Sequence, residues 1–296
     1  MGRLSGKHIV VTGASAGIGT ELCRQLGREQ CRVTLAARRE ELLLQVAGEV
    51  RGAGGQAEAV VADVTDRAQV FELARRAEAA FGPIDIWVSN AGAGISHRLL
   101  DATEEDMLHL YRLNCLSSLW AYQALLPGWM ARGYGQFIDV CSLGGKVGYA
   151  YSGGYSAAKH ALSGIGDVLR QELALQGFPP GPLRRAKTTA PRPWLTVTTV
   201  YPGPTISDFG KARSDRIALS ATRPPGADIG ELRRNRNFIV RAVAGPQPTA
   251  FVARAIVRAM LRPVCVVYPH RWGTLAVVAN HIAPAPLLRA MSRLGR

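Results

Sequence analysis

The chain has 296 residues, of which 47% are hydrophobic and 20% charged, and it contains 32 glycines. This length is enough to bury a substantial core, and the composition excludes a disordered, collagen-like or repeat protein. The five cysteines form no CxxC pair and no secretory leader precedes the first strand-like run, so we expect reduced thiols in a cytoplasmic protein. The apolar run at 273–288 is too interrupted for a membrane span of roughly 20 apolar residues.

The net charge of +14 is unevenly distributed. Residues 1–176 contain 17 Lys/Arg and 18 Asp/Glu, whereas residues 177–296 contain 19 and 4. A basic half can meet an anionic partner, such as phospholipid headgroups or a phosphorylated substrate, or it can be an ordinary solvated surface of an arginine-rich chain. Nucleic-acid binding is not expected, because the excess charge is confined to one half and no DNA- or RNA-binding motif accompanies it.

Short apolar runs alternate with longer segments of helical period, which predicts an α/β protein with a parallel sheet wrapped by helices. Seven strands are expected, at residues 8–12, 32–37, 56–61, 84–89, 136–141, 195–201 and 264–268. Helices are expected at residues 17–30, 39–53, 67–81, 104–130, 155–174 and 249–261, and Thr249 is the predicted cap of the last one.

A glycine-rich turn, TGASAGIG at residues 12–19, follows the first strand and opens the first helix. Gly13 permits the tight turn, while Gly17 and Gly19 let backbone amides and the helix N-terminus approach a pyrophosphate. In this context the turn predicts nucleotide binding.

The end of the second strand indicates which nicotinamide cofactor is used. An NAD-binding chain is expected to place an Asp or Glu there for the ribose 2′-hydroxyl, but this chain has Ala37, Arg38 and Arg39. Guanidinium groups suit a 2′-phosphate, and no carboxylate precedes them. We therefore expect NADP(H) to be preferred over NAD(H). The alternative is that Arg39 and Glu40 simply begin a solvated helix.

Across essentially its whole length the chain resembles the short-chain dehydrogenase/reductase family. TGASAGIG resembles the family's TGxxxGxG, Asp63-Val64 its adenine-contacting pair, Asn90-Ala91-Gly92 its NAG motif, and Pro202-Gly203 with Thr205 its PG motif. The resemblance implies one Rossmann-type catalytic domain over residues 1–270, with a doubly wound parallel sheet and helices on both faces. It implies cofactor contacts from Gly13, Ser15, Ala16, Gly17, Ile18, Gly19, Arg38, Arg39, Asp63, Val64, Asn90, Ala91, Gly92, Tyr155, Lys159, Pro202, Gly203 and Thr205.

Asn114, Ser142, Tyr155 and Lys159 fall where the family's catalytic residues are expected. Ketone reduction needs a proton on oxygen, and a tyrosine can supply it if its pKa, normally about 10, moves toward the working pH. Lys159 lies one helical turn from Tyr155, where its positive charge favours the phenolate. Ser142 can donate to the substrate oxygen. The resemblance implies that Lys159 also binds the cofactor ribose and that Asn114 connects it through water to solvent.

The histidines give weaker signals. His97 follows the NAG motif, where it could line the substrate pocket, whereas His160 is on a different helix face from Tyr155 and is not expected to act in the chemistry. The six histidines have no metal-ligand spacing, so no metal site is expected.

Three segments depart from the family pattern. Residues 178–194 are a Pro- and Arg-rich insertion at the amino-terminal edge of the strands, which we expect to be a surface flap or an oligomer contact. Residues 207–245 follow the PG motif, where the family has its substrate lid, and with residues 93–100 they are expected to set specificity. Residues 271–296 are a basic amphipathic extension that fits a membrane surface, or packing on the domain or on a partner subunit.

These patterns together predict an NADP(H)-dependent oxidoreductase that interconverts a ketone and a secondary alcohol. The substrate is expected to be hydrophobic, lipid- or steroid-like, and the protein a homodimer or homotetramer. One alternative is a reductase of carrier- or lipid-linked 3-oxo groups. Another is a non-catalytic nucleotide-binding or scaffold protein, against which the intact set of four catalytic residues argues.

Overall fold

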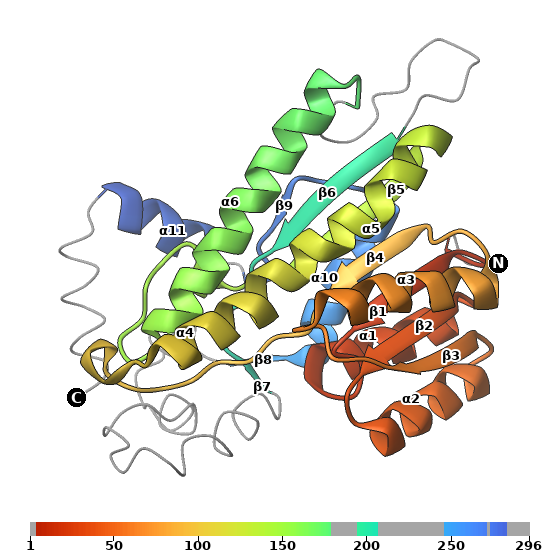
Figure 1. Cartoon of the computed structure of the whole chain (residues 1–296), viewed down its shortest axis with the longest axis horizontal. Helices are drawn as coiled ribbons and strands as arrows, with labels where there is room; N and C mark the ends of the chain where they lie inside the picture. The colour runs from red at the N-terminus through yellow and green to blue at the C-terminus, as the bar shows by residue number, and fades with distance from the viewer. Residues whose placement is uncertain (1–3, 179–193, 207–245, 271–272, 283–296) are drawn as a thin grey trace.

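A computed structural model describes residues 4–178, 194–206, 246–270 and 273–282 (Figure 1). Its main sheet has the strand order β3-β2-β1-β4-β5-β6-β9, and each neighbouring pair is parallel. The strands are β1 (His8–Thr12), β2 (Arg32–Ala37), β3 (Gln56–Val61), β4 (Ile86–Ser89), β5 (Tyr134–Val140), β6 (Trp194–Val200) and β9 (Val266–Val267). A separate two-stranded parallel sheet pairs β7 (Thr205–Ile206) with β8 (Gln247–Pro248).

Helices cover both faces of the main sheet, because the buried strands are apolar on both sides. Ile9 and Val11 of β1 enter one core while Val10 enters the other, as the two-residue period of a strand requires. The first core is closed by α1 (Gly17–Arg28), α2 (Glu40–Gly52) and α10 (Thr249–Leu261). The second is closed by α3 (Arg67–Phe81), α5 (Ser117–Arg132) and α6 (Gly153–Leu175).

The strand order places the site. From β1 the chain builds outward to β2 and β3, and it then returns to the other side of β1 to build β4, β5 and β6. The loops that follow β1 and β4 therefore diverge at the carboxyl edge of the sheet, the position where open α/β sheets bind ligands.

Most predicted elements are confirmed, with ends that shift by a few residues. The helix expected at residues 104–130 is not regular, because α4 (Glu104–Tyr111) and α5 are separated by a π-helical segment, Arg112–Leu116. The prediction that Thr249 caps its helix is wrong: Pro248 occupies the cap position of α10 and makes no side-chain capping bond. The strand expected at residues 264–268 is reduced to β9.

The sequence analysis did not anticipate the β7–β8 sheet. The predicted amphipathic extension contains a helix, α11 (Gly273–Ile282). Most of the insertion, the lid at residues 207–245 and the end of the basic extension lie outside the described residues. No helix in the described ranges is long and apolar enough to cross a membrane.

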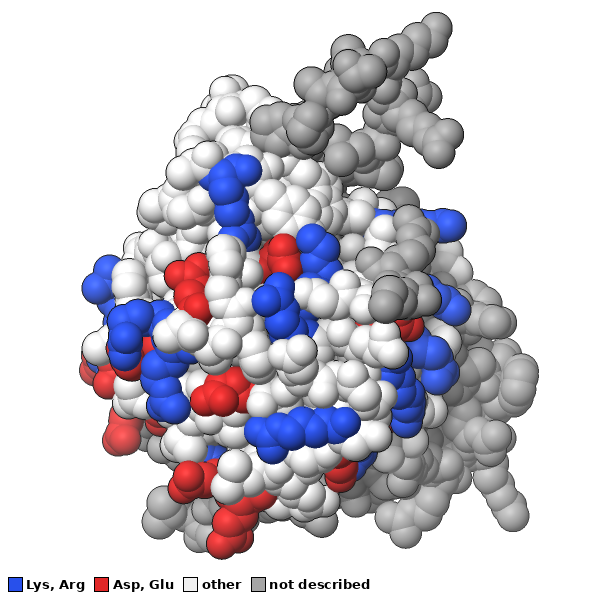
Figure 2. All heavy atoms as spheres, turned by 90° about the vertical axis from the view of Figure 1, so that its right-hand side faces the viewer, with Lys and Arg blue, Asp and Glu red and all other residues white. Residues whose placement is uncertain are grey.

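On one side of the molecule the described residues carry surface charges of both signs. Figure 2 shows the side of the molecule that lies to the right in Figure 1, and Lys and Arg side chains are interspersed there with Asp and Glu. This pattern agrees with the nearly balanced charge of residues 1–176.

Candidate active site

The glycine turn after β1 packs directly on the loop after β4. Gly13 has φ of 65°, and a Cβ atom there would lie 2.8 Å from the Cα atom of Ala91. Gly17 also has positive φ, at 60°, and a Cβ atom on Gly19 would clash with the carbonyl oxygen of Gly13. Glycine is therefore required for both the backbone conformation and the close approach, as the motif predicts.

The NAG motif holds this turn in place through hydrogen bonds. Asn90 Nδ2 donates to the carbonyl oxygens of Thr12, at 2.9 Å, and Gly13, at 3.2 Å. Thr12 Oγ1 accepts from the backbone amides of Asn90 and Ala91 at 3.0 and 3.1 Å. Helix α1 then begins after Ala16, whose methyl side chain cannot accept from the first-turn amides. Backbone amides without a side-chain cap at a helix N-terminus suit a phosphate, so the residues present fit a dinucleotide.

Arg38 and Arg39 lie beside the same turn. Arg39 Nη2 donates to Ser15 Oγ at 3.3 Å, and Arg38 Nη1 lies 3.8 Å from Asp63 Oδ2. The Arg38 side chain is 70% exposed, so it is accessible to a ligand. The ion pair with Arg38 also partly offsets the charge of Asp63. Val64 is buried in the second core, and Ile18 packs against the first.

Lys159 and Tyr155 lie in the first two turns of α6. Lys159 is only 3% exposed, and its Nζ donates to the carbonyl oxygen of Val140 at 3.0 Å. The Nζ atom lies 5.9 Å from the centroid of the Tyr155 ring. Burial lowers the pKa of Lys159 below its usual value, because the ammonium form is poorly solvated there. The predicted pair is thus close in space.

Ser142 and Tyr155 converge on Gly144. Ser142 follows β5 and caps a 3-10 turn, Leu143–Gly145, because its Oγ accepts from the amide of Gly144 at 3.0 Å. A Cβ atom on Gly144 would lie 3.3 Å from both Ser142 Oγ and Tyr155 Cε1. The serine hydroxyl and the tyrosine ring therefore flank the same small space.

Asn114 is tied into the π-helical segment and faces Lys159 across Gly92. Its Nδ2 donates to the carbonyl oxygens of Ala93, at 2.9 Å, and Leu110, at 3.1 Å. Leu110 lies four residues earlier, so the Asn114 side chain occupies a carbonyl that the helix backbone would otherwise use, which favours the wider turn. A Cβ atom on Gly92 would lie 2.8 Å from Asn114 Oδ1 and 3.5 Å from Lys159 Nζ. Asn114 Oδ1 is buried and has no hydrogen-bond partner in the described part of the chain.

The PG motif closes the site from β6. The carbonyl oxygen of Pro202 accepts from the amide of Leu143 at 2.9 Å, which joins this motif to the Ser142 turn. Thr205 Oγ1 donates to the carbonyl oxygen of Gly203 at 2.9 Å, and Thr205 begins β7. The predicted cofactor residues outside α6 thus follow the carboxyl ends of β1, β2, β3, β4 and β6, and Ser142 follows that of β5.

Two residues near this site were missed by the sequence analysis. Asp139 on β5 is fully buried, and burial raises the pKa of its carboxyl to about 6 while Tyr122 Oη donates to it. Gln247 on β8 is 5% exposed, and neither of its amide atoms has a hydrogen-bond partner in the described part. Asp139 could have been found from the sequence, because a carboxylate within an apolar strand is unusual. Gln247 could not, because only the pairing of β7 with β8 brings it beside the PG motif.

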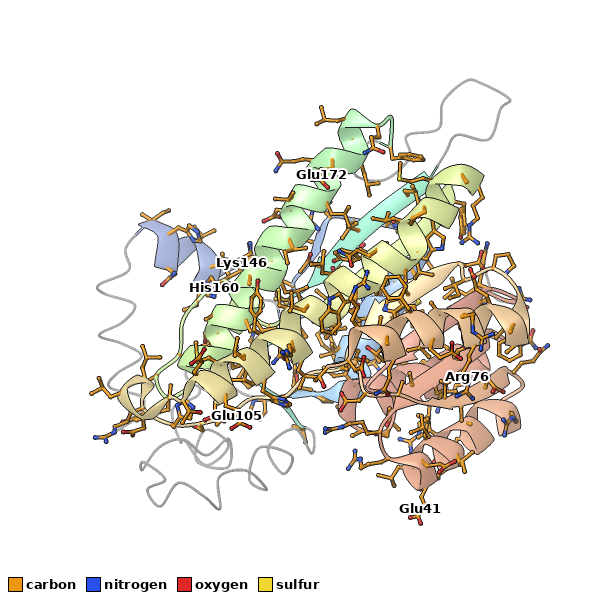
Figure 3. All side chains as sticks on the ribbon, in the orientation of Figure 1. Glu41, Arg76, Glu105, Lys146, His160 and Glu172 are labelled. Carbon is orange, nitrogen blue, oxygen red and sulfur yellow. The ribbon has the colours of Figure 1, made fainter. Side chains whose placement is uncertain are left out.

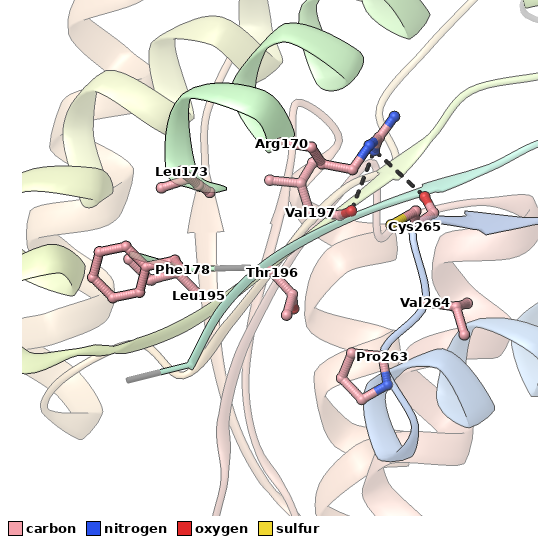
Figure 4. A pocket seen from close by; sticks show the side chains of 9 residues that line it. All are labelled: Arg170, Leu173, Phe178, Leu195, Thr196, Val197, Pro263, Val264 and Cys265. Atoms are coloured by element: carbon pink, nitrogen blue, oxygen red, sulfur yellow. Dashed lines mark hydrogen bonds between the residues drawn. The ribbon is translucent and has the colours of Figure 1, made fainter. Parts of the chain in front are cut away.

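Other features lie apart from the site. His160 is exposed on the outer side of α6, and its Nδ1 contacts the carbonyl oxygen of Ser156 (Figure 3). A small pocket at the amino-terminal end of β6 is lined mainly by α6, β6 and the segment before β9, and Arg170 there donates to the carbonyl oxygens of Val197 and Cys265 (Figure 4). None of the four predicted catalytic residues lines it. Among the described residues no cluster of His, Cys, Asp and Glu could hold a metal ion.

Comparison with known proteins gives the family. A family model described as short chain dehydrogenase matches residues 7–216. The chain is 36% identical over 243 residues to the ketoacyl reductase HetN of Nostoc sp., covering 82% of this chain and 77% of that protein. A short-chain dehydrogenase/reductase from Burkholderia phymatum in complex with NAD has a TM-score of 0.78 at 21% identity, covering 95% of both chains. An actinorhodin polyketide ketoreductase with NADPH has a TM-score of 0.72 at 26% identity, covering 90% of this chain and 97% of that one.

The chain belongs to the short-chain dehydrogenase/reductase family. It is an oxidoreductase that uses a nicotinamide cofactor and acts on carbonyl or alcohol groups. The predicted Rossmann-type fold, with its seven-stranded parallel sheet in a single domain, is confirmed.

Proposed function

We propose that the protein is an NADP(H)-dependent reductase of hydrophobic ketones, with Tyr155 as the proton donor and Lys159 and Ser142 as its partners. The observation that carries this proposal is the convergence of Ser142 Oγ and the Tyr155 ring on Gly144, with the buried Lys159 ammonium 5.9 Å from the ring centroid. These groups lie at the carboxyl edge of the sheet beside the glycine turn.

The chemistry follows from these positions. The cofactor, when bound, supplies the hydride. As negative charge develops on the substrate oxygen, Ser142 donates a hydrogen bond to it and Tyr155 transfers its phenolic proton. Lys159 stabilises the phenolate that remains, because its ammonium lies close by in a poorly solvated environment. Asn114 positions this machinery, since its Nδ2 is held by two backbone carbonyls and its Oδ1 faces Lys159.

The preference for NADP(H) is supported by Arg38 and Arg39 at the end of β2 and by the ion pair that offsets Asp63. The test is the ratio of kcat/KM for NADPH to that for NADH. We expect the ratio to exceed about 10 and to fall by one to two orders of magnitude in R38Q/R39Q, since two charged hydrogen-bond donors are lost. R76Q removes an exposed arginine of α3 (Figure 3) and should leave the ratio unchanged. Faster turnover with NADH in the wild type would reject the preference.

A hydrophobic substrate is supported by exposed apolar residues on the segments that follow the NAG, Ser142 and PG motifs. Leu99 and Leu100 are 67% and 93% exposed in the loop that follows the NAG motif, and Tyr149 and Ile206 are also exposed. The substrate lid that the sequence predicts at residues 207–245 lies outside the described residues. Turnover should therefore rise with chain length in a series of aliphatic ketones.

A second candidate is a reductase of 3-oxo groups linked to a carrier or lipid. It is favoured by the similarity to the ketoacyl reductase HetN and to the polyketide ketoreductase. The basic residues 177–296 could meet a phosphate-bearing carrier. If the free ketone is turned over more efficiently than its thioester, this candidate is rejected.

We further propose a cytoplasmic homodimer or homotetramer, with peripheral membrane contact through residues 271–296. The five cysteines are all free thiols, which supports a reducing compartment. Leu275, Val278 and Ile282 expose an apolar side of α11, which supports contact with lipid or with a partner subunit. Light scattering gives the assembly, and co-sedimentation with anionic vesicles at low and high salt tests the membrane contact.

A further inference from the structure

We propose that Gln247 is a further cofactor-binding residue, whose side-chain amide pairs with the carboxamide of the nicotinamide ring and fixes the ring beside the catalytic residues. This inference rests on the proposed function only in assuming that the reacting carbonyl lies between Ser142 and Tyr155. It concerns a buried amide for which the described part of the chain offers no hydrogen-bond partner.

Two short strands bring Gln247 from a distant part of the chain to the PG motif. Its backbone amide donates to the carbonyl oxygen of Pro204 at 2.8 Å, and in the parallel pair of β7 and β8 it is the register partner of Thr205. Its Nε2 atom lies 3.8 Å from the position that a Cβ atom on Gly203 would take. The side chain is therefore beside the turn that follows β6.

The side-chain amide of Gln247 is buried with both of its polar atoms unpaired. The residue is 5% exposed, and neither Nε2 nor Oε1 has a hydrogen-bond partner in the described part. A primary amide has two N–H donors and one carbonyl acceptor, and leaving them buried and unpaired is costly. The amide therefore calls for a partner that presents an acceptor and a donor together.

Gly203 leaves the space next to this amide open. A Cβ atom there would meet Leu143 Cδ1 at 3.5 Å, and Gln247 Nε2 and His270 Cβ at 3.8 Å, which are ordinary van der Waals contacts. Its φ is not in the left-handed region. Neither the backbone nor the packing of the described residues requires glycine here. Glycine also serves where a ligand approaches the backbone closely, and that reason fits a position beside an unpaired amide.

The same turn is joined to the catalytic residues. The carbonyl oxygen of Pro202 accepts from the amide of Leu143, the residue that follows Ser142, at 2.9 Å. A hydride passes only between groups in contact, so the nicotinamide ring has to lie beside the carbonyl that Ser142 and Tyr155 hold. The PG turn, with Gln247 behind it, is next to that position.

The carboxamide of the nicotinamide ring matches both atoms of the Gln247 amide. Gln247 Nε2 can donate to the carboxamide oxygen while Gln247 Oε1 accepts from the carboxamide nitrogen, so that each amide satisfies the other. Phosphate groups present acceptors only and would leave Oε1 unpaired. A ribose hydroxyl offers a single oxygen for both atoms. Because NAD⁺ and NADP⁺ carry the same carboxamide, the pairing does not depend on which of them is preferred.

The test measures binding and needs no turnover. Isothermal titration calorimetry gives the dissociation constants of wild type and Gln247→Met for NADP⁺, for its 3-acetylpyridine analogue and for adenosine 2′,5′-bisphosphate. The analogue has a methyl ketone in place of the carboxamide and so lacks the N–H donors, and the bisphosphate lacks the nicotinamide. Gln247→Met should bind NADP⁺ about tenfold more weakly, the loss expected for two hydrogen bonds between uncharged groups, and the bisphosphate with unchanged affinity.

The analogue isolates the proposed pairing. Wild type should bind it about fivefold more weakly than NADP⁺, and this ratio should fall below about twofold in Gln247→Met, because the partner of the lost donors is already gone. Gln56→Met is the matched control, since it makes the same change at an exposed glutamine that begins β3. It should leave all three dissociation constants unchanged.

Thermal unfolding separates a binding role from a structural one. Without cofactor, Gln247→Met should unfold at the wild-type temperature or above it, because two unpaired buried atoms are removed, whereas saturating NADP⁺ should stabilise the variant less. A lower unfolding temperature with unchanged affinity for NADP⁺, or an unchanged analogue ratio, would overturn the proposal. If the ratio falls as expected but Tyr155→Phe keeps full activity, the proposed function fails and the pairing stands.

Discussion

Gly92→Ala perturbs the contact between Asn114 and Lys159 without touching either residue. The added methyl would lie 2.8 Å from Asn114 Oδ1 and 3.5 Å from Lys159 Nζ. Asn114 cannot easily yield, because its Nδ2 is bonded to the carbonyl oxygens of Ala93 and Leu110. Overpacking of this kind costs about 1–3 kcal/mol, and a displacement of roughly 1 Å in a catalytic group lowers kcat by about 10²-fold.

The assay is NADPH oxidation with a saturating ketone, together with thermal unfolding of the same samples. We expect kcat of the Gly92→Ala variant to fall by about 10²-fold, while the protein stays folded and loses at most a few kcal/mol. Gly128→Ala is the matched control, because a methyl on this exposed glycine of α5 meets no atom within 4 Å. It should keep full activity and gain about 0.5–1 kcal/mol of stability. Wild-type kcat in Gly92→Ala would refute the reasoning.

Three further predictions concern the glycine turn, the buried Asp139 and the ammonium group of Lys159. Gly19→Ala forces a clash with the carbonyl oxygen of Gly13, so the thermal stabilisation by NADPH should be lost, as a thermal-shift assay would show. Burial raises the pKa of Asp139 from 3.8 to about 6, so the stability that its carboxyl contributes is present below pH 4 and is lost as pH rises through 6. By chemical denaturation the wild type should lose about 2–3 kcal/mol by pH 8, and Asp139→Asn should abolish this loss. An unchanged loss in Asp139→Asn would contradict the assignment. Lys159→Met should lower kcat by about 10²–10⁴-fold at neutral pH, and a loss below threefold would show that the ammonium is dispensable.

The sequence predicted the sheet and most of its helices because both signals are local. Each parallel strand is buried on both faces and reads as a short apolar run, and each helix has a 3.6-residue period. The glycine turn could also be predicted, because the positive φ of Gly13 and its close approach to Ala91 allow only glycine at this position. Ser142, Tyr155 and Lys159 were predicted from the resemblance to the family, and the structure places Ser142 just after β5 and the other two in α6.

The features that were missed depend on contacts between distant segments. The π-helical segment contains Asn114, whose side chain donates to the carbonyl oxygens of Ala93 and Leu110, contacts that a helical period does not reveal. Thr249 looked like a cap, but β8 continues through Pro248 and α10 begins one residue earlier than a Thr249 cap would allow. The bridge between His97 and Ser152 likewise joins segments that are far apart in the sequence.

The central claim is that Tyr155 donates the proton in a nicotinamide-dependent ketone reduction. It is tested most directly by measuring kcat and NADPH affinity of Tyr155→Phe beside the wild type on the same ketone. The account predicts a fall in kcat of about 10²–10⁴-fold, with the dissociation constant of NADPH changed less than threefold, because only the phenolic proton is removed. Full activity in Tyr155→Phe would contradict the account.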